Sequence, residues 1–212
     1  MKEMAACVLI LILLVMSCVE REIYVTPIDI LDLLPDDNEI NGWIKTESTR
    51  YAETADQLTS IIDGEAVPYI NNGFRAAVFQ EYQGTINNNL VPLDVRIFDM
   101  GDTINAKNVY DDVETPGDSA WVGNNPGREA RINVSFLFSY QIDFWADSFF
   151  VRIVIEDKSN IGLGIAKDFA FNISDAIYAS RLAPAGGNSA LLPRERLFYP
   201  AANSLCKPLR SI

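Results

Sequence analysis

The feature that most constrains the fold is an alternation of apolar and polar residues along the middle of the chain. A period of two places every second side chain on the same face, which is typical of β-strands with one buried face. The polar residues 83–89 and the pair Asp147-Ser148 separate successive runs as turns, so those runs should pair antiparallel. The alternation predicts five strands, at residues 74–82, 91–97, 130–138, 140–146 and 149–156.

Helical patterns flank these runs. Thr54 and Gln57 have the spacing of a capping box, and Asp102 can cap a second helix. Residues 65–70 suggest a short helix, and an apolar stripe predicts a long one at roughly 161–182. The order of elements indicates an α+β fold, an antiparallel β-sheet of about five to six strands with helices packed on one face. We expect one domain at residues 41–212, including an extended carboxyl-terminal segment.

The amino-terminal residues predict export. Residues 4–17 are uncharged and apolar, but a membrane span needs about 20 such residues, so a secretory signal is the better interpretation. The run ends in Val15-Met16-Ser17-Cys18, which resembles the lipobox of bacterial lipoproteins. That resemblance implies a signal peptide at 1–17, a lipidated Cys18, a tether at 18–40 and anchoring to a bacterial membrane in the cell envelope.

Two details qualify this predicted localisation. Val19 stands where some Gram-negative lipoproteins carry an aspartate that retains them at the inner membrane, so the outer membrane or periplasm is favoured if the source is Gram-negative. An uncleaved anchor helix, or an ordinary signal peptide followed by an unrelated cysteine, remains an alternative.

Composition excludes several chemistries. The chain has no histidine, which rules out histidine-based triads, imidazole acid–base catalysis and His-containing zinc sites. Cys7 lies inside the leader and Cys18 at its end, which leaves Cys206 without a partner for an internal disulfide. The net charge of −12 repels phosphate backbones, so we expect no nucleic-acid partner, and no motif implies a cofactor.

Scattered motifs resemble a known family. They are Asp63-Gly64-Glu65-Ala66, Gly73-Phe74, Phe98-Asp99-Met100-Gly101, Leu192-Pro193 and Tyr199-Pro200. Together, over roughly residues 33–205, they look like an uncharacterised bacterial envelope domain family whose members often follow signal peptides. The resemblance implies neither an activity nor catalytic residues. The layout is also similar to PsbP-type α/β sandwiches, an analogy of architecture alone.

The polar positions of the predicted strands form a candidate binding face. With Phe79, Phe98 and Phe150 on the same side, they suit either a solvated sheet with cross-strand Asp–Arg pairs or a docking surface with exposed aromatic groups. The face comprises Asp94, Arg96, Asn133, Gln141, Asp143, Trp145 and Arg152.

Other acidic residues have simpler structural interpretations. Asp99, Asp102, Asp111 and Asp112 flank one predicted helix, but without the spacing of a calcium loop, so we expect no metal. Glu65 suits the first turn of a helix, where negative charge is favourable.

These observations favour a non-enzymatic envelope lipoprotein with a binding or structural accessory domain. The expected partners are the membrane, through lipidated Cys18, and an envelope protein or polymer. The alternative is a hydrolase that attacks envelope polymers with two carboxylates, as glycosidases do, although the sequence identifies no such pair and no catalytic residue.

Overall fold

The computed structural model describes residues 28–182. Cys7, Cys18 and Cys206, the predicted signal peptide and the predicted carboxyl-terminal segment lie outside the described residues. In chain order the elements are η1 (Ile30–Leu33), β1 (Ile44–Lys45), β2 (Arg50–Ala52), α2 (Ala55–Ile62), η2 (Asp63–Ala66), α3 (Val67–Asn71), β3 (Ala76–Ile86), β4 (Asn89–Asp99), α4 (Thr103–Asp112), β5 (Asp118–Ala120), β6 (Glu129–Asn133), β7 (Tyr140–Ala146), β8 (Phe149–Ile155) and α5 (Asn160–Leu182).

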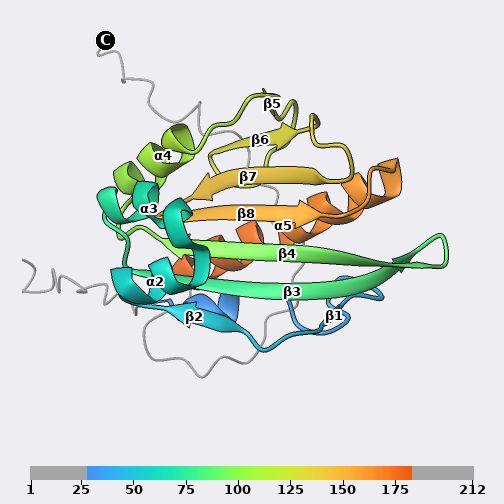
Figure 1. Cartoon of the computed structure of the whole chain (residues 1–212), viewed down its shortest axis with the longest axis horizontal. Coiled ribbons are helices and arrows are strands. Elements are labelled where there is room, and N and C mark those ends of the chain that lie inside the picture. Colours follow the sequence, from blue (N-terminus) through green and yellow to red (C-terminus); the bar gives the residue numbers. More distant parts are fainter. Residues whose placement is uncertain (1–27, 183–212) are drawn as a thin grey trace, which may run out of the picture.

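One antiparallel sheet organises the chain, and the α+β class is confirmed (Figure 1). Its eight strands follow the order β1-β3-β4-β8-β7-β6-β5, and β2 pairs with β3 beside β1. The five predicted strands correspond to β3, β4, β6, β7 and β8. The three additional strands, β1, β2 and β5, have two or three residues each, too few to show an alternation.

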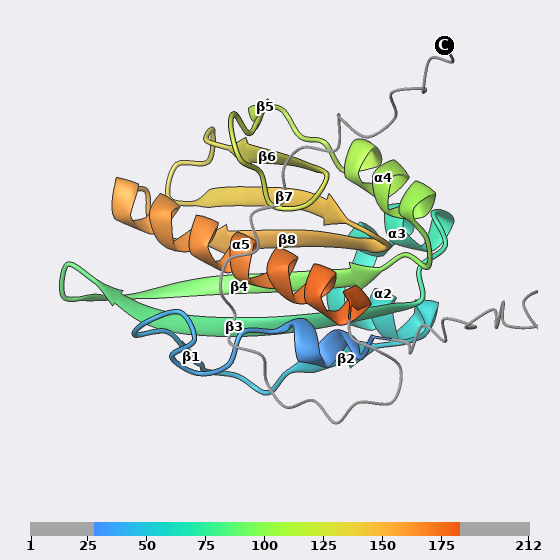
Figure 2. The same ribbon diagram turned by 180° about the vertical axis from the view of Figure 1, so that it is seen from behind.

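The helices lie on both faces of the sheet, where the sequence predicted one. Figure 1 shows α2, α3 and α4 in front of one end of the sheet, and Figure 2 shows α5 crossing the opposite face. Each face therefore has its own apolar core. Val95, Ile97 and Val151 pack with Phe169 and Ile173 of α5 in the larger core.

The smaller core lies between the sheet and the three front helices. The alternate strand residues Phe79, Phe98 and Phe150 pack there with Leu58 of α2 and Val109 of α4. The front helices reach only part of their face, which determines what remains available for binding.

Two strand ends differ from the prediction for local reasons. The β3–β4 turn has two residues, Asn87 and Asn88, both at positive φ, whereas the sequence predicted a turn over 83–89. Asparagine tolerates this conformation, and such turns match the twist of a hairpin. Strand β6 ends at Asn133 and not at 138, because the Asn133 carboxamide oxygen accepts the Ser135 amide at 2.9 Å and bends the chain out of the sheet.

The predicted helix starts are confirmed. Thr54 and Gln57 form the capping box of α2, and Asp102 caps α4 by accepting the Asn105 amide at 2.8 Å. The predicted tether includes a packed part, since Ile30 and Leu33 of η1 are buried against α5 and β3. Within residues 28–182, the structure contains no helix with the length and apolarity needed to cross a bilayer.

Candidate functional site

The structure places all seven residues of the candidate face on the same side of the sheet. Pairing sets Arg96 opposite Arg152 and Arg152 opposite Asp143 in one row across three strands. The adjacent row carries Asp94, Gln141 and Asn133. Trp145 lies opposite Phe150 in the row on the other side. The side chains nevertheless divide into three environments, so the face is not one continuous surface.

The aromatic end of the face is covered by the chain's own helices. Phe79, Phe98 and Phe150 are fully buried, and Phe98 stacks on Tyr69 of α3 with ring centroids 3.9 Å apart. Trp145 is half-buried against the same core. These aromatic groups therefore stabilise the packing of α2, α3 and α4 and are not the exposed recognition groups that the docking interpretation required.

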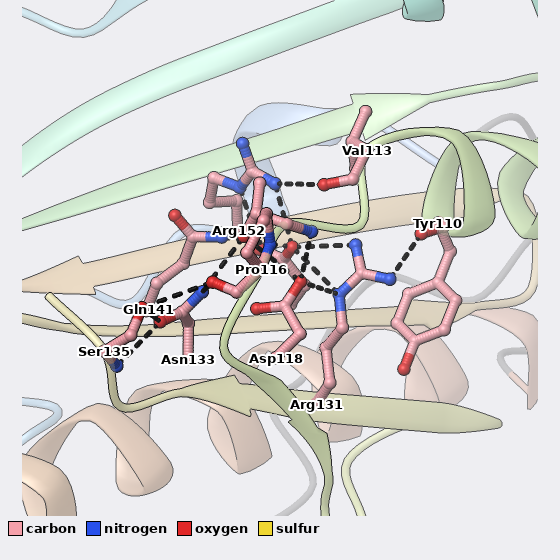
Figure 3. A network of polar contacts seen from close by, with 11 residues as sticks. Tyr110, Val113, Pro116, Asp118, Arg131, Asn133, Ser135, Gln141 and Arg152 are labelled. Atoms are coloured by element: carbon pink, nitrogen blue, oxygen red, sulfur yellow. Dashed lines mark hydrogen bonds and ion pairs between the residues drawn. The ribbon is translucent and has the colours of Figure 1, made fainter.

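The middle of the face is a buried ion network (Figure 3). Arg131 lies between two carboxylates, with Nε 3.1 Å from Asp118 Oδ2 and Nη2 3.0 Å from Asp143 Oδ2. Arg152 binds the other side of Asp143, and the Asp143 side chain is 1% exposed. Two guanidinium groups and two carboxylates balance in charge, which is the condition under which buried ions are tolerated.

This network attaches the segment after α4 to the sheet. Arg131 Nη1 donates to the Tyr110 carbonyl at 2.6 Å, and Asn133 donates to Thr115 Oγ1 and to the Pro116 carbonyl. Thr115 in turn donates its amide to Asp118. Asn133, Gln141, Asp143 and Arg152 of the predicted face are therefore occupied by internal partners, while Arg131 and Asp118 complete the network.

The carboxylate of Asp143 stabilises the charged form of Arg152. Burial alone would lower the pKa of Arg152, but the hydrogen bonds and charge of Asp143 outweigh it and raise the pKa above its ordinary value.

Two buried atoms, Asp118 Oδ1 and Trp145 Nε1, have no hydrogen-bond partner within the described part of the chain.

The third environment is an open basin beyond the network, on the β3–β4–β8 part of the face. It is a depression of about 280 Å³ whose polar groups are three carboxylates and two guanidinium groups. Asp94 and Arg96 are the two members of the predicted face that line it, and Arg96 Nε contacts Asp94 Oδ2 at 2.6 Å. We call this depression the basin; its lining is Arg50, Glu81, Pro92, Leu93, Asp94, Arg96, Val154 and Glu156.

Neighbouring contacts orient the two arginines of the basin. Arg96 also binds Glu65 of η2 at 3.2 Å, so Glu65 is exposed and ion-paired at the start of the short helices. Burial lowers the pKa of Arg96, and the charges of Asp94 and Glu65 more than compensate, so the pKa is raised. Arg50 lies over the Phe79 ring, 5.5 Å from its centroid.

The aspartates around α4 act as structural groups. Asp99 accepts the Gly101 amide, Asp111 binds Lys107 at 2.6 Å, and Asp112 accepts from Asn72. Across residues 28–182, no three His, Cys, Asp or Glu side chains gather in a way that could hold a metal ion.

Sequence patterns carried a signal for some of the residues that the candidate face omitted. Arg131 lies two positions before Asn133, and Glu81 lies two positions after Phe79. In a strand such residues share a face, so both could have been assigned to this face. Arg50 lies in a three-residue strand, and Asp118 follows a loop, so neither has a periodic signal.

Comparison with known proteins adds no relative. No family model, no curated protein and no solved structure matches the chain.

Proposed function

We propose that this chain is a non-enzymatic lipoprotein of the bacterial cell envelope, anchored through acylated Cys18, whose domain binds a polar partner in the basin. The observation that carries the binding role is the position of the basin. The front helices cover one end of this face, and the basin is a depression in the β3–β4–β8 part that they do not cover.

The chemistry of the basin favours a polar ligand with groups of both charges. Two guanidinium groups and three carboxylates line it, with Pro92, Leu93 and Val154 between them. An extended peptide or a charged envelope polymer offers such groups, whereas a purely apolar ligand would leave five charged side chains desolvated. A phosphate-rich polymer fits poorly, since acidic groups outnumber basic ones in the basin.

The proposed membrane anchor and the proposed binding site need separate tests. Intact mass of the membrane-extracted protein should show a chain that begins at Cys18 with added acyl mass, and Cys18→Ser should lack both. A full-length, unmodified species would refute the lipoprotein assignment.

Crosslinking in membranes tests the basin. Arg50→Glu should abolish crosslinks to a stoichiometric envelope partner, because Arg50 is an exposed cation at the basin edge. Arg128→Glu is the matched control, since Arg128 is also an exposed arginine but lies outside the basin. Equal crosslinking by the wild type and both variants would contradict a binding role for the basin.

A second candidate is the carboxylate-based hydrolase. Glu81 and Asp94 are directly opposed across the β3–β4 pair, where Cβ atoms lie about 5 Å apart. Glycosidases use two carboxyl groups about 5–10 Å apart, a range that side chains on neighbouring Cβ atoms can span. Glu81→Gln tests this candidate, because it should abolish release of fragments from purified envelope polymers, and activity at the wild-type level would exclude this pair.

A further inference from the structure

The most unusual surface of the domain is an apolar loop, residues 134–138, between β6 and β7. Its sequence is Val-Ser-Phe-Leu-Phe, with no charged residue. Leu137 and Phe138 are 80% and 79% exposed, and Val134 and Phe136 are exposed as well. Single exposed apolar residues are ordinary, but four within five positions mark an interaction surface.

The loop is held in place at both ends. Lys158 Nζ donates to the Val134 carbonyl at 2.7 Å and to the Ser139 carbonyl at 3.1 Å, joining the two sides of the loop. Ser135 Oγ donates to the Pro116 carbonyl. These bonds occupy the polar groups at the base of the loop, while the large apolar side chains of the tip remain in contact with water.

Two further exposed apolar residues belong to the same end of the domain. The β3–β4 hairpin, the β6–β7 loop and the start of α5 all lie at one end of the sheet (Figures 1 and 2). Leu90 of the hairpin is 70% exposed, and Ile161 of α5 is 52% exposed. At the base of the loop, Lys158 lies over the Tyr140 ring at 4.2 Å, a pairing of cation and aromatic ring that suits a membrane–water interface.

We propose that the 134–138 loop inserts its apolar tip into the interfacial region of a lipid bilayer and so orients the domain on the membrane. This inference rests on the proposed function, because acylated Cys18 would hold the domain at that bilayer. A diacylated cysteine would already anchor the chain stably, so the loop would add a second contact that fixes the orientation of the domain.

The length of chain between anchor and domain permits this contact. The ten steps from Cys18 to Ile28 span at most about 36 Å, which is close to the length of an eleven-residue strand such as β4. A segment of this length permits a bilayer contact at either end of the sheet. The net charge of −12 makes zwitterionic lipid the better match, since anionic headgroups would repel the domain.

A fluorophore at the loop tip provides the test. The full chain with Cys7→Ser, Cys206→Ser and Leu137→Cys is produced in bacteria, labelled with a polarity-sensitive thiol dye, and reconstituted into phosphatidylcholine vesicles with or without spin-labelled lipid. The matched control carries Ile104→Cys, because Ile104 is 70% exposed on α4 at the opposite end of the sheet.

We expect a blue-shifted emission at position 137 and quenching by spin-labelled lipid roughly threefold stronger than at position 104. Equal, weak quenching at both positions would overturn the proposal. A blue shift without vesicles that grows with protein concentration would assign the loop to a second copy of the chain, and it would also overturn the proposal.

The same sample separates this inference from the proposed function. Intact mass counts the dye molecules, since acylated Cys18 leaves one reactive thiol and unmodified Cys18 leaves two. The number of dye molecules shows whether Cys18 is acylated. The difference in quenching between positions 137 and 104 shows whether the loop enters the bilayer.

Discussion

Arg152 binds the carboxylate of Asp143 at two points, with Nε 2.8 Å from Oδ1 and Nη2 2.8 Å from Oδ2. The planar guanidinium matches both oxygens, an arrangement that a lysine could not reproduce. Arg131 binds the same carboxylate from β6, so one buried aspartate joins three neighbouring strands. Polar residues that resemble a solvent face in the sequence thus form part of the interior.

Removing one member of this network should strongly destabilise the fold. In Arg152→Met, Asp143 loses its two-point partner while remaining buried, and breaking a buried pair costs about 3–5 kcal/mol. Urea unfolding followed by circular dichroism measures the free energy of unfolding. Arg96→Met is the control, because the Arg96 pairs are more exposed, and the expected loss there is about 1 kcal/mol or less. Equal losses in the two variants would refute the structural role of the network.

Buried tyrosines should make the fold sensitive to alkaline pH. Burial raises the pKa of Tyr69 to about 12, against an ordinary value of 10. Below pH 10 the phenol is protonated in both states, so its contribution to stability is complete. Between pH 10 and 12 the unfolded chain ionises first, and stability falls by up to ~3 kcal/mol as the pH passes the folded-state pKa.

Tyr69→Phe tests this linkage. The variant keeps the ring that stacks on Phe98 but has no group to ionise. Urea unfolding at pH 9 and at pH 12 should therefore show a smaller loss of stability in the variant than in the wild type. Parallel pH profiles for the two proteins would show that Tyr69 does not carry the effect.

The fold class was predictable because the alternation acts locally. Phe79 and Val95 point to opposite faces simply because each has its place in a period of two, and the strand pairing follows from the turns. The coverage of each face was not predictable in this way. An apolar stripe such as that on α5 shows that a helix packs on something, but not which side of the sheet it covers.

The candidate site was predictable to the same extent. The alternation places Asp94 and Asp143 on one face of the sheet. Their burial differs, however, because Asp94 lines the basin and Asp143 lies in the buried ion network. That difference depends on the ion pair between Arg131 and Asp118, residues from β6 and the short strand β5. Local periodicity contains no information on such a long-range contact.

Gly84 should be intolerant of a side chain because an indole occupies its space. A Cβ atom at Gly84 of β3 would overlap the ring of Trp43, which is buried and packs edge-on against Phe169. Gly84→Ala should lower the free energy of unfolding by about 1–3 kcal/mol and change the tryptophan emission as Trp43 is displaced.

A second glycine provides the control for that substitution. Gly164 in α5 has open space where a Cβ would be added, and alanine is the better helix former by about 1 kcal/mol. Gly164→Ala should therefore leave stability unchanged or raise it. A Gly84→Ala protein as stable as the wild type would show that Trp43 can move without penalty.

Lys158 should determine how firmly the apolar loop is held. Its ammonium group binds carbonyl oxygens on both sides of the loop, at Val134 and Ser139, and methionine at 158 would keep the length of the side chain without these bonds. Hydrogen bonds to a charged donor contribute about 1.5 kcal/mol or more, and local opening scales with that loss, so Lys158→Met should raise the opening frequency about tenfold. Chymotrypsin cleaves after Phe136, Leu137 and Phe138, and native-state cleavage there should accelerate by the same factor.

The control is Lys107→Met, which removes a lysine bound to Asp111 in α4, away from the loop, and should leave the cleavage rate unchanged. If both variants were cleaved at the wild-type rate, the lysine would have no part in ordering the loop, and the covalent connection to β6 and β7 would be sufficient to hold it.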